Sequence, residues 1–156
     1  MKVKLMGSFL RLTLIVLLLV VCVALIAGVF LSIRLPELAA EKFGPPAGSL
    51  NFFQRVVYSF RLLANESRLL SPADAQGLPR KFTVELGEPV NSIAARLEEE
   101  RFIVNADTFR TYLIYAGLDT GVQAGEYQLS PAMTMVEIAT ELQDSAPEEV
   151  EFIILA

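Results

Sequence analysis

The feature that most constrains this chain is an unbroken run of uncharged, mostly apolar residues near its N-terminus. The run extends from Leu12 to Ile33 and contains 22 residues. As an α-helix rising about 1.5 Å per residue it would measure about 33 Å, which matches a bilayer hydrocarbon core of about 30 Å. A cleaved signal peptide has a shorter apolar core and a small-residue cleavage site. We therefore expect residues 12–33 to form an uncleaved transmembrane helix in contact with the lipid bilayer.

The charges that flank this run predict its orientation. The tail of residues 1–11 carries Lys2, Lys4 and Arg11, whereas Arg34 beyond the run is soon followed by two glutamates. Basic residues are retained on the cytoplasmic side of a membrane span. We therefore expect a single-pass protein of the plasma (inner) membrane, with a cytoplasmic N-terminus and an extracytoplasmic C-terminal part.

The cysteine and histidine content removes several kinds of site. Cys22 is the only cysteine, it lies inside the apolar run, and the chain contains no histidine. A disulfide within the chain and a thiolate metal cluster are therefore excluded, and we expect neither a metal site nor a cofactor. Lipid attachment at Cys22 is disfavoured because Val21 stands where a small residue would be needed.

The charge of the remaining chain restricts its partners. The part beyond residue 33 has 10 basic and all 18 acidic residues, a net charge of −8, and its length suits one compact domain. A negative surface repels phosphate backbones, so nucleic acid is excluded as a partner. A glycan or another protein remains compatible with this charge.

The segment 34–80 reads as a linker that contains one amphipathic helix. Helix-breaking residues follow the apolar run closely, at Pro36, Gly44, Pro45, Pro46 and Gly48. They predict an extended spacer that no helix crosses. A helix is then expected over residues 50–70, with Ser49 or Asn51 as its cap.

The apolar stripe of this expected helix allows two interpretations. Apolar residues recur at helical spacing, at Phe53, Val56, Val57, Phe60, Leu63 and Ala64. Basic residues on the opposite side, Arg55, Arg61 and Arg68, permit a helix that lies on the membrane surface. Because three arginines make a thin basic face, we favour a stripe that packs on the domain or on another subunit.

Residues 81–156 show the pattern of a small α+β domain. The expected elements are a strand at 81–86, helices at 90–102 and 106–116, a strand at 126–129, a helix from Ser130–Pro131, and a strand at 150–155. Their order is β-α-α-β-α-β. The fold class expected for the whole chain is therefore one transmembrane helix, one amphipathic connecting helix and a small α+β domain.

Three segments of this domain resemble a known family. They are "FTVELGEPVNSIAARLEEERFIVNADTFRTYLIYAGL", "VQAGEYQLSPAMTMVEIATELQDS" and "EEVEFIIL". They look like the N-terminal half of the YceG-like, or MltG, endolytic murein transglycosylases. The resemblance implies a LysM-like module that sits against the glycan strands of peptidoglycan. By the same resemblance the glycan groove falls on two loops, at Gly87, Glu88 and Pro89, and at Thr120, Gly121 and Gly125.

The resemblance also implies where catalysis would occur in the family. The catalytic domain opens with a strand and an acidic residue, and that residue would fall at or just after Ala156, which is not an acid. The remaining glutamates read as solvated or connecting residues, at Glu98, Glu99, Glu100, Glu126, Glu148, Glu149 and Glu151. We therefore expect no catalytic residue in this chain and a LysM-like domain that is incomplete at its C-terminus.

Three functions remain open from the sequence. The favoured one is a membrane-anchored, peptidoglycan-associated module that does not cleave glycan strands on its own. The second is an assembly module of a cell-wall synthesis complex, in contact with other cell-wall synthesis proteins. The third is a truncated transglycosylase without independent activity.

Overall fold

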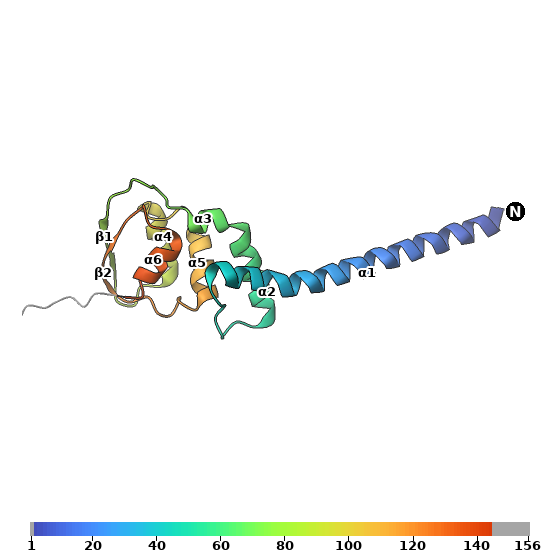
Figure 1. Cartoon of the computed structure of the whole chain (residues 1–156), viewed down its shortest axis with the longest axis horizontal. Coiled ribbons are helices and arrows are strands. Elements are labelled where there is room, and N and C mark those ends of the chain that lie inside the picture. The colour runs from blue at the N-terminus through green and yellow to red at the C-terminus, as the bar shows by residue number, and fades with distance from the viewer. Residues whose placement is uncertain (1, 145–156) are drawn as a thin grey trace, which may run out of the picture.

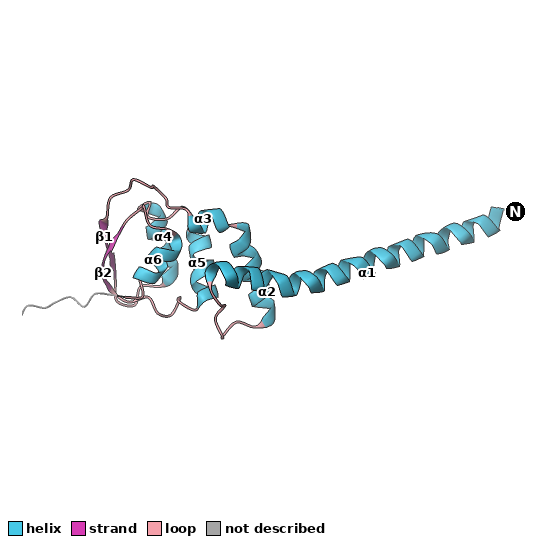
Figure 2. Ribbon diagram, in the orientation of Figure 1, coloured by secondary structure: helices cyan, strands magenta, loops and turns pink. Residues whose placement is uncertain are grey.

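A long N-terminal helix projects from a small mixed domain (Figure 1). The computed structural model describes residues 2–144, and the expected strand at 150–155 lies outside them. Figure 2 shows that helices dominate and that the sheet is small. The elements, in chain order, are α1 (Lys2–Phe43), α2 (Phe52–Ala64), α3 (Glu66–Leu70), β1 (Arg80–Val84), α4 (Val90–Glu99), α5 (Ala106–Ala116), β2 (Gly125–Leu129) and α6 (Met135–Glu141).

Helix α1 continues beyond the expected span and corrects the prediction of an extended spacer after residue 33. It passes through Pro36 and ends at Phe43, where Gly44 adopts a left-handed conformation with φ of +85°. A proline costs a helix one backbone hydrogen bond. The last turns of α1 compensate for that loss by packing on the domain, where Ala39 and Phe43 are buried.

The expected helix over residues 50–70 is divided into α2 and α3. The predicted cap at Asn51 is confirmed, because its side chain accepts from the Gln54 amide while the Gln54 side chain accepts from the Asn51 amide. At Asn65 the side-chain amide donates to the Arg61 carbonyl at 2.9 Å. This local bond competes with continued helix geometry, and the chain turns there.

The face that α2 packs against the domain includes only part of the predicted apolar stripe, because Leu63 packs against the core but the phenylalanines do not. Ser59 and Leu62 are buried, whereas Phe53 and Phe60 are 74% and 58% exposed. Helix α2 contacts α1 on one side and α5 on another. The expectation that the stripe packs on the domain is therefore wrong for its two phenylalanines.

The two strands form an antiparallel sheet at the end of the domain farthest from the N-terminus of α1 (Figure 1). Phe82 and Val84 of β1, with Tyr127 and Leu129 of β2, are buried, while the residues between them are exposed. This alternation is the one expected for a sheet with one wet face. On that outer face Lys81 and Glu126 form an ion pair.

The order β1-α4-α5-β2-α6 agrees with the prediction, but the last helix begins later than expected. Helix α6 starts at Met135 and not at Pro131, because Thr134 caps it through the Glu137 amide and Glu137 accepts from the Thr134 amide at 2.7 Å. The apolar residues Met135, Ile138 and Ala139 of this helix, and Leu142 after it, are all buried.

Helix α5 joins the membrane-proximal and sheet ends of the core, because it contacts α2, α3, α4 and α6. Tyr115 is fully buried, and its hydroxyl donates to the Gly44 carbonyl at 3.1 Å. The Ala47 amide in turn donates to the Tyr115 carbonyl at 2.7 Å. Burial raises the pKa of Tyr115 above its usual 10.0. These two hydrogen bonds thus connect the segment after α1 to α5.

The cap of α6 predicts an acid-sensitive contribution to stability. Hydrogen bonds from the Thr134 amide and hydroxyl lower the pKa of Glu137 below its usual 4.5. A lowered pKa in the folded state stabilises the fold above pH 4.5, and this is lost as the pH falls through the folded-state pKa. Because solvent screens this exposed residue, Glu137→Gln should lower stability at pH 7 by only about 0.3–1 kcal/mol, with little difference in strong acid. Urea midpoints of both proteins at pH 7 and in strong acid measure this, and a pH-independent difference would contradict it.

Candidate functional site

The strand register brings the two loops named by the sequence to one end of the sheet. Val84, the last residue of β1, pairs with Gly125, the first residue of β2. The loop that leaves β1 and the loop that enters β2 therefore emerge side by side. Of the six predicted residues, Gly87, Glu88 and Pro89 lie on the first loop, Thr120 and Gly121 lie on the second, and Gly125 begins β2 at the end of the second loop. We call this surface the loop end of the sheet.

The first loop is a tight turn held by a glutamate. Gly87 has φ of +78°, a left-handed conformation that a residue without Cβ adopts without strain. The Glu88 side chain accepts from the Glu85 amide at 3.1 Å, and both its oxygens lie 2.9 Å from Nη1 of Arg96. Glu88 is therefore committed to shaping the turn and offers little of its carboxylate to a ligand.

Arg96 connects this turn to the sheet. Its Nη2 donates to the Thr83 carbonyl at 2.9 Å, and its guanidinium lies 4.7 Å from the centre of the Phe82 ring. The Arg96 side chain thereby joins a strand, a turn and a helix. Such a network holds the loop in one conformation before any ligand arrives, which lowers the entropy cost of binding.

The second loop is fastened to the end of α6. The Gln143 side chain donates to the Leu118 carbonyl at 3.2 Å, and the Gln123 side chain donates to the Gln143 carbonyl at 2.8 Å. A Cβ on Gly121 would lie 2.1 Å from Oε1 of Gln143, so the loop passes close to this side chain. Thr120 between these anchors is exposed. The loop therefore presents Thr120 from a fixed backbone.

Tyr127 supports the second loop from inside the domain. It is buried, and its hydroxyl donates to the Gln123 carbonyl at 2.6 Å. Burial raises the pKa of Tyr127 above its usual 10.0, and the nearby negative charge of Glu141 raises it further. Tyr127 is therefore a neutral hydrogen-bond donor at physiological pH. The sequence predicted a strand at Tyr127 but did not predict that its hydroxyl supports the loop.

The loop end of the sheet is better suited to binding than to proton transfer. Within residues 12–144, every aspartate and glutamate side chain belongs to a residue that is at least partly exposed. The most enclosed of the paired carboxylates, Glu88, is held by Arg96. A general acid needs a pKa raised by burial or by a like charge. The exposed loops, with backbone amides, carbonyls and a threonine hydroxyl, offer hydrogen bonds to a neutral polar ligand instead.

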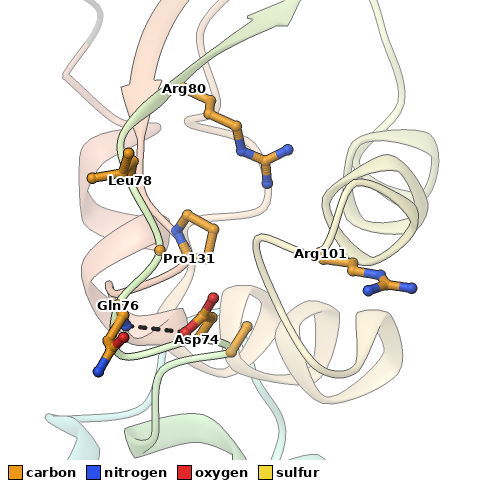
Figure 3. Close-up of a pocket in the computed structure, with 8 residues that line it drawn as sticks. Asp74, Gln76, Leu78, Arg80, Arg101 and Pro131 are labelled. Carbon is orange, nitrogen blue, oxygen red and sulfur yellow. Dashed lines mark hydrogen bonds between the residues drawn. The ribbon is translucent and has the colours of Figure 1, made fainter.

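A cavity of about 600 Å³ lies at the opposite end of the sheet, where β1 begins (Figure 3). The Asp74 side chain accepts from the Gln76 amide at 3.0 Å, and the Asp74 amide donates to the Pro131 carbonyl at 2.9 Å. Figure 3 shows Arg101 pointing away from Asp74 and Gln76. The full lining is Ala73, Asp74, Gln76, Gly77, Leu78, Arg80, Arg101 and Pro131.

The sequence did not predict this cavity, because residues 71–79 were assigned to the linker. The Arg80 side chain already has two partners within the fold. Its Nη2 donates to the Glu100 carbonyl at 2.8 Å, and its guanidinium lies 4.4 Å from the centre of the Phe102 ring. One backbone feature of the structure stands out beside this cavity: Arg101 has φ of +60°. A left-handed non-glycine residue marks a forced turn, but it does not identify a ligand.

Fold and site together define a class of protein: a small α+β domain whose exposed loops lie at one end and whose other end carries a helix long enough to cross a membrane. Comparison with known families then gives one match. Residues 82–155 match the model of the YceG-like family, which confirms the resemblance seen in the sequence. The matched segment begins in β1 and includes both loops of the site.

Two further comparisons gave no match. No curated protein sequence is significantly similar to the chain. No solved structure is significantly similar to it either.

Proposed function

We propose that this chain is a single-pass membrane protein that associates with peptidoglycan through the loop end of its sheet. The observation that carries the proposal is the YceG-like match over residues 82–155. That family acts on glycan strands of the cell wall, as the sequence resemblance implies. The proposed role is to hold a glycan strand at a set distance from the membrane, without cleaving it.

The order and pairing of the elements support a LysM-like interpretation of the domain. Strands β1 and β2 form an antiparallel pair and are connected through α4 and α5. In a LysM-like fold the glycan groove lies between the loop after the first strand and the loop before the second. These are the two loops that the register places at the same end of the sheet, so the proposed glycan contacts include Thr120 and the backbone around Gly87.

The arrangement along the molecule supports the proposed orientation. Figure 1 places the sheet and the N-terminus of α1 at opposite ends of the molecule. With α1 crossing the plasma membrane and the N-terminus in the cytoplasm, the loop end lies outside the cytoplasm and away from the bilayer. The wall polymer would meet the domain there.

Co-sedimentation with purified, insoluble peptidoglycan tests the proposal. The full chain in detergent micelles should sediment with the polymer, and Thr120→Glu should weaken binding at least about fivefold, equivalent to ~1 kcal/mol. The new carboxylate would occupy space beside the proposed glycan contacts and require desolvation there. Ser67→Glu is the matched control, because Ser67 is exposed on α3, outside the two loops. Failure of the unmodified chain to sediment, or equal loss in both variants, would refute the proposed site.

A further inference from the structure

Helix α2 exposes an apolar face that the domain leaves uncovered. Phe53 and Phe60 are seven residues apart, so they lie on the same side of the helix, and they are 74% and 58% exposed. Ala64 continues this side and is also exposed. Leu62, on the opposite side of the helix, and Ser59, between the two sides, are buried. Helix α2 is therefore well packed on one side, and its two phenylalanines are exposed on another.

The place of α2 in the fold determines where this face points. Helix α2 packs against both α1 and α5. Figure 1 shows α2 running across the C-terminal part of α1, with α5 on the side of α2 away from the N-terminus of α1. The side of α2 opposite to α5 therefore faces along α1, toward the apolar residues 12–33.

The distance along α1 agrees with contact between α2 and a bilayer. Leu35 and Pro36 are partly buried, and Ala39 is the first fully buried residue of α1, so the domain contacts α1 over these turns. From Ile33 to Ala39 the helix rises about 9 Å, and side chains extend about 5–6 Å from a helix axis. The headgroup region on each side of the hydrocarbon core is about 5–8 Å thick. With residues 12–33 in the hydrocarbon core, Phe53 and Phe60 would reach the headgroup region.

The chemistry of the exposed residues fits that region. Transfer of a phenylalanine side chain from water to an apolar environment is favourable. Arg61 is exposed on the same helix, and Arg34 is exposed at the end of the span. Aromatic residues with nearby arginines are typical of helices that lie at the membrane–water interface.

We propose that α2 lies in the interfacial region of the same bilayer that α1 crosses, with Phe53 and Phe60 in contact with lipid. This inference rests on the proposed membrane anchoring by α1. With α2 placed in this way, both α1 and α2 contact the bilayer, and the two helices lie at an angle to each other. The domain is then held in one orientation and cannot rotate freely on a single helix. The sheet is thereby held on the side of the domain away from the membrane (Figure 1).

Tryptophan fluorescence in the full chain tests the inference, because the natural sequence contains no tryptophan. Single variants Phe53→Trp and Phe60→Trp are reconstituted in phosphatidylcholine vesicles with or without brominated acyl chains. Two reference positions accompany them: Leu19→Trp inside the span, and Leu86→Trp in the first loop, where Leu86 is 94% exposed. We expect blue-shifted emission and about twofold quenching by bromine at positions 53 and 60, and no quenching at position 86.

The reference positions distinguish the possible failures. Quenching at Leu19→Trp without quenching at Phe53→Trp and Phe60→Trp would overturn the interfacial position of α2 and leave the anchor intact. Blue-shifted emission at positions 53 and 60 without bromine quenching would also overturn it, since the face would then be covered by a second copy of the chain. Absence of quenching at Leu19→Trp would refute the anchoring itself.

Discussion

Replacing Phe102 with alanine should destabilise the domain by about 3–5 kcal/mol, a large share of the total stability of a small domain. Phe102 is 1% exposed, and its ring meets that of Phe82 edge to face at a centroid distance of 5.6 Å. The Arg80 guanidinium covers the Phe102 ring at 4.4 Å. The substitution leaves a cavity and removes both ring contacts. Urea unfolding followed by tyrosine near-ultraviolet circular dichroism measures the loss.

A surface control makes this prediction specific. Leu78→Ala removes apolar atoms at a position that is 78% exposed, so the midpoint should change by less than about 0.5 kcal/mol. Phe102→Leu, which keeps most of the volume, should fall between the two. Equal midpoints for Phe102→Ala and Leu78→Ala would show that Phe102 is not at the centre of the core.

Leu62→Ala should cost about 2–5 kcal/mol although Leu62 lies outside the family match. Leu62 is fully buried in α2, the helix that contacts both α1 and α5. If the membrane-proximal helices and the sheet form one cooperative unit, this loss must appear in the unfolding of the whole domain. The measurement is the urea midpoint reported by the tyrosines, all four of which lie between residues 58 and 127.

Leu86→Ala is the matched control for this second prediction. It makes the same chemical change at a position that is 94% exposed, and it should leave the midpoint within about 0.5 kcal/mol. A Leu62→Ala protein whose tyrosine signal unfolds with an unchanged midpoint would mean that α2 is not part of the cooperative unit.

Local patterns were sufficient to predict the elements of the sheet end. Helix α5 has the predicted bounds because Asn105 caps its start and Gly117, with φ of +73°, ends it. The alternation of Phe82 and Val84 placed β1 within a residue or two. Glycines and prolines separated the elements, so these assignments needed no tertiary information.

Contacts between distant segments decided what the sequence left open. Pro36 signals a helix end, but buried contacts at Ala39 and Phe43 stabilise the turns that follow it. The apolar stripe of α2 indicated a packed face, yet its phenylalanines are exposed, while Leu62 and Ser59 outside the stripe are buried. Helical periodicity identifies an apolar face and does not identify its partner.

The candidate site was likewise predicted in part by the sequence and in part decided by contacts between distant segments. The resemblance named the two loops, and the register of β1 and β2 brings them to one end of the sheet. The tie between Glu88 and Arg96 was not foreseen, because eight positions separate these residues and only the turn at Gly87 brings them together. The resemblance named Glu88 as a glycan contact, which stays a prediction, and in the structure its carboxylate accepts from Arg96 and from the Glu85 amide.

Labelling of single cysteines from one side of the membrane tests most directly whether the sheet end lies outside the cytoplasm. Cys22 is the only cysteine, so Cys22→Ser provides a background without thiols. In intact spheroplasts, a membrane-impermeant maleimide should label Thr120→Cys fully and Ser8→Cys only after the membrane is opened. Labelling of Ser8→Cys in closed spheroplasts, with Thr120→Cys protected until lysis, would contradict the account.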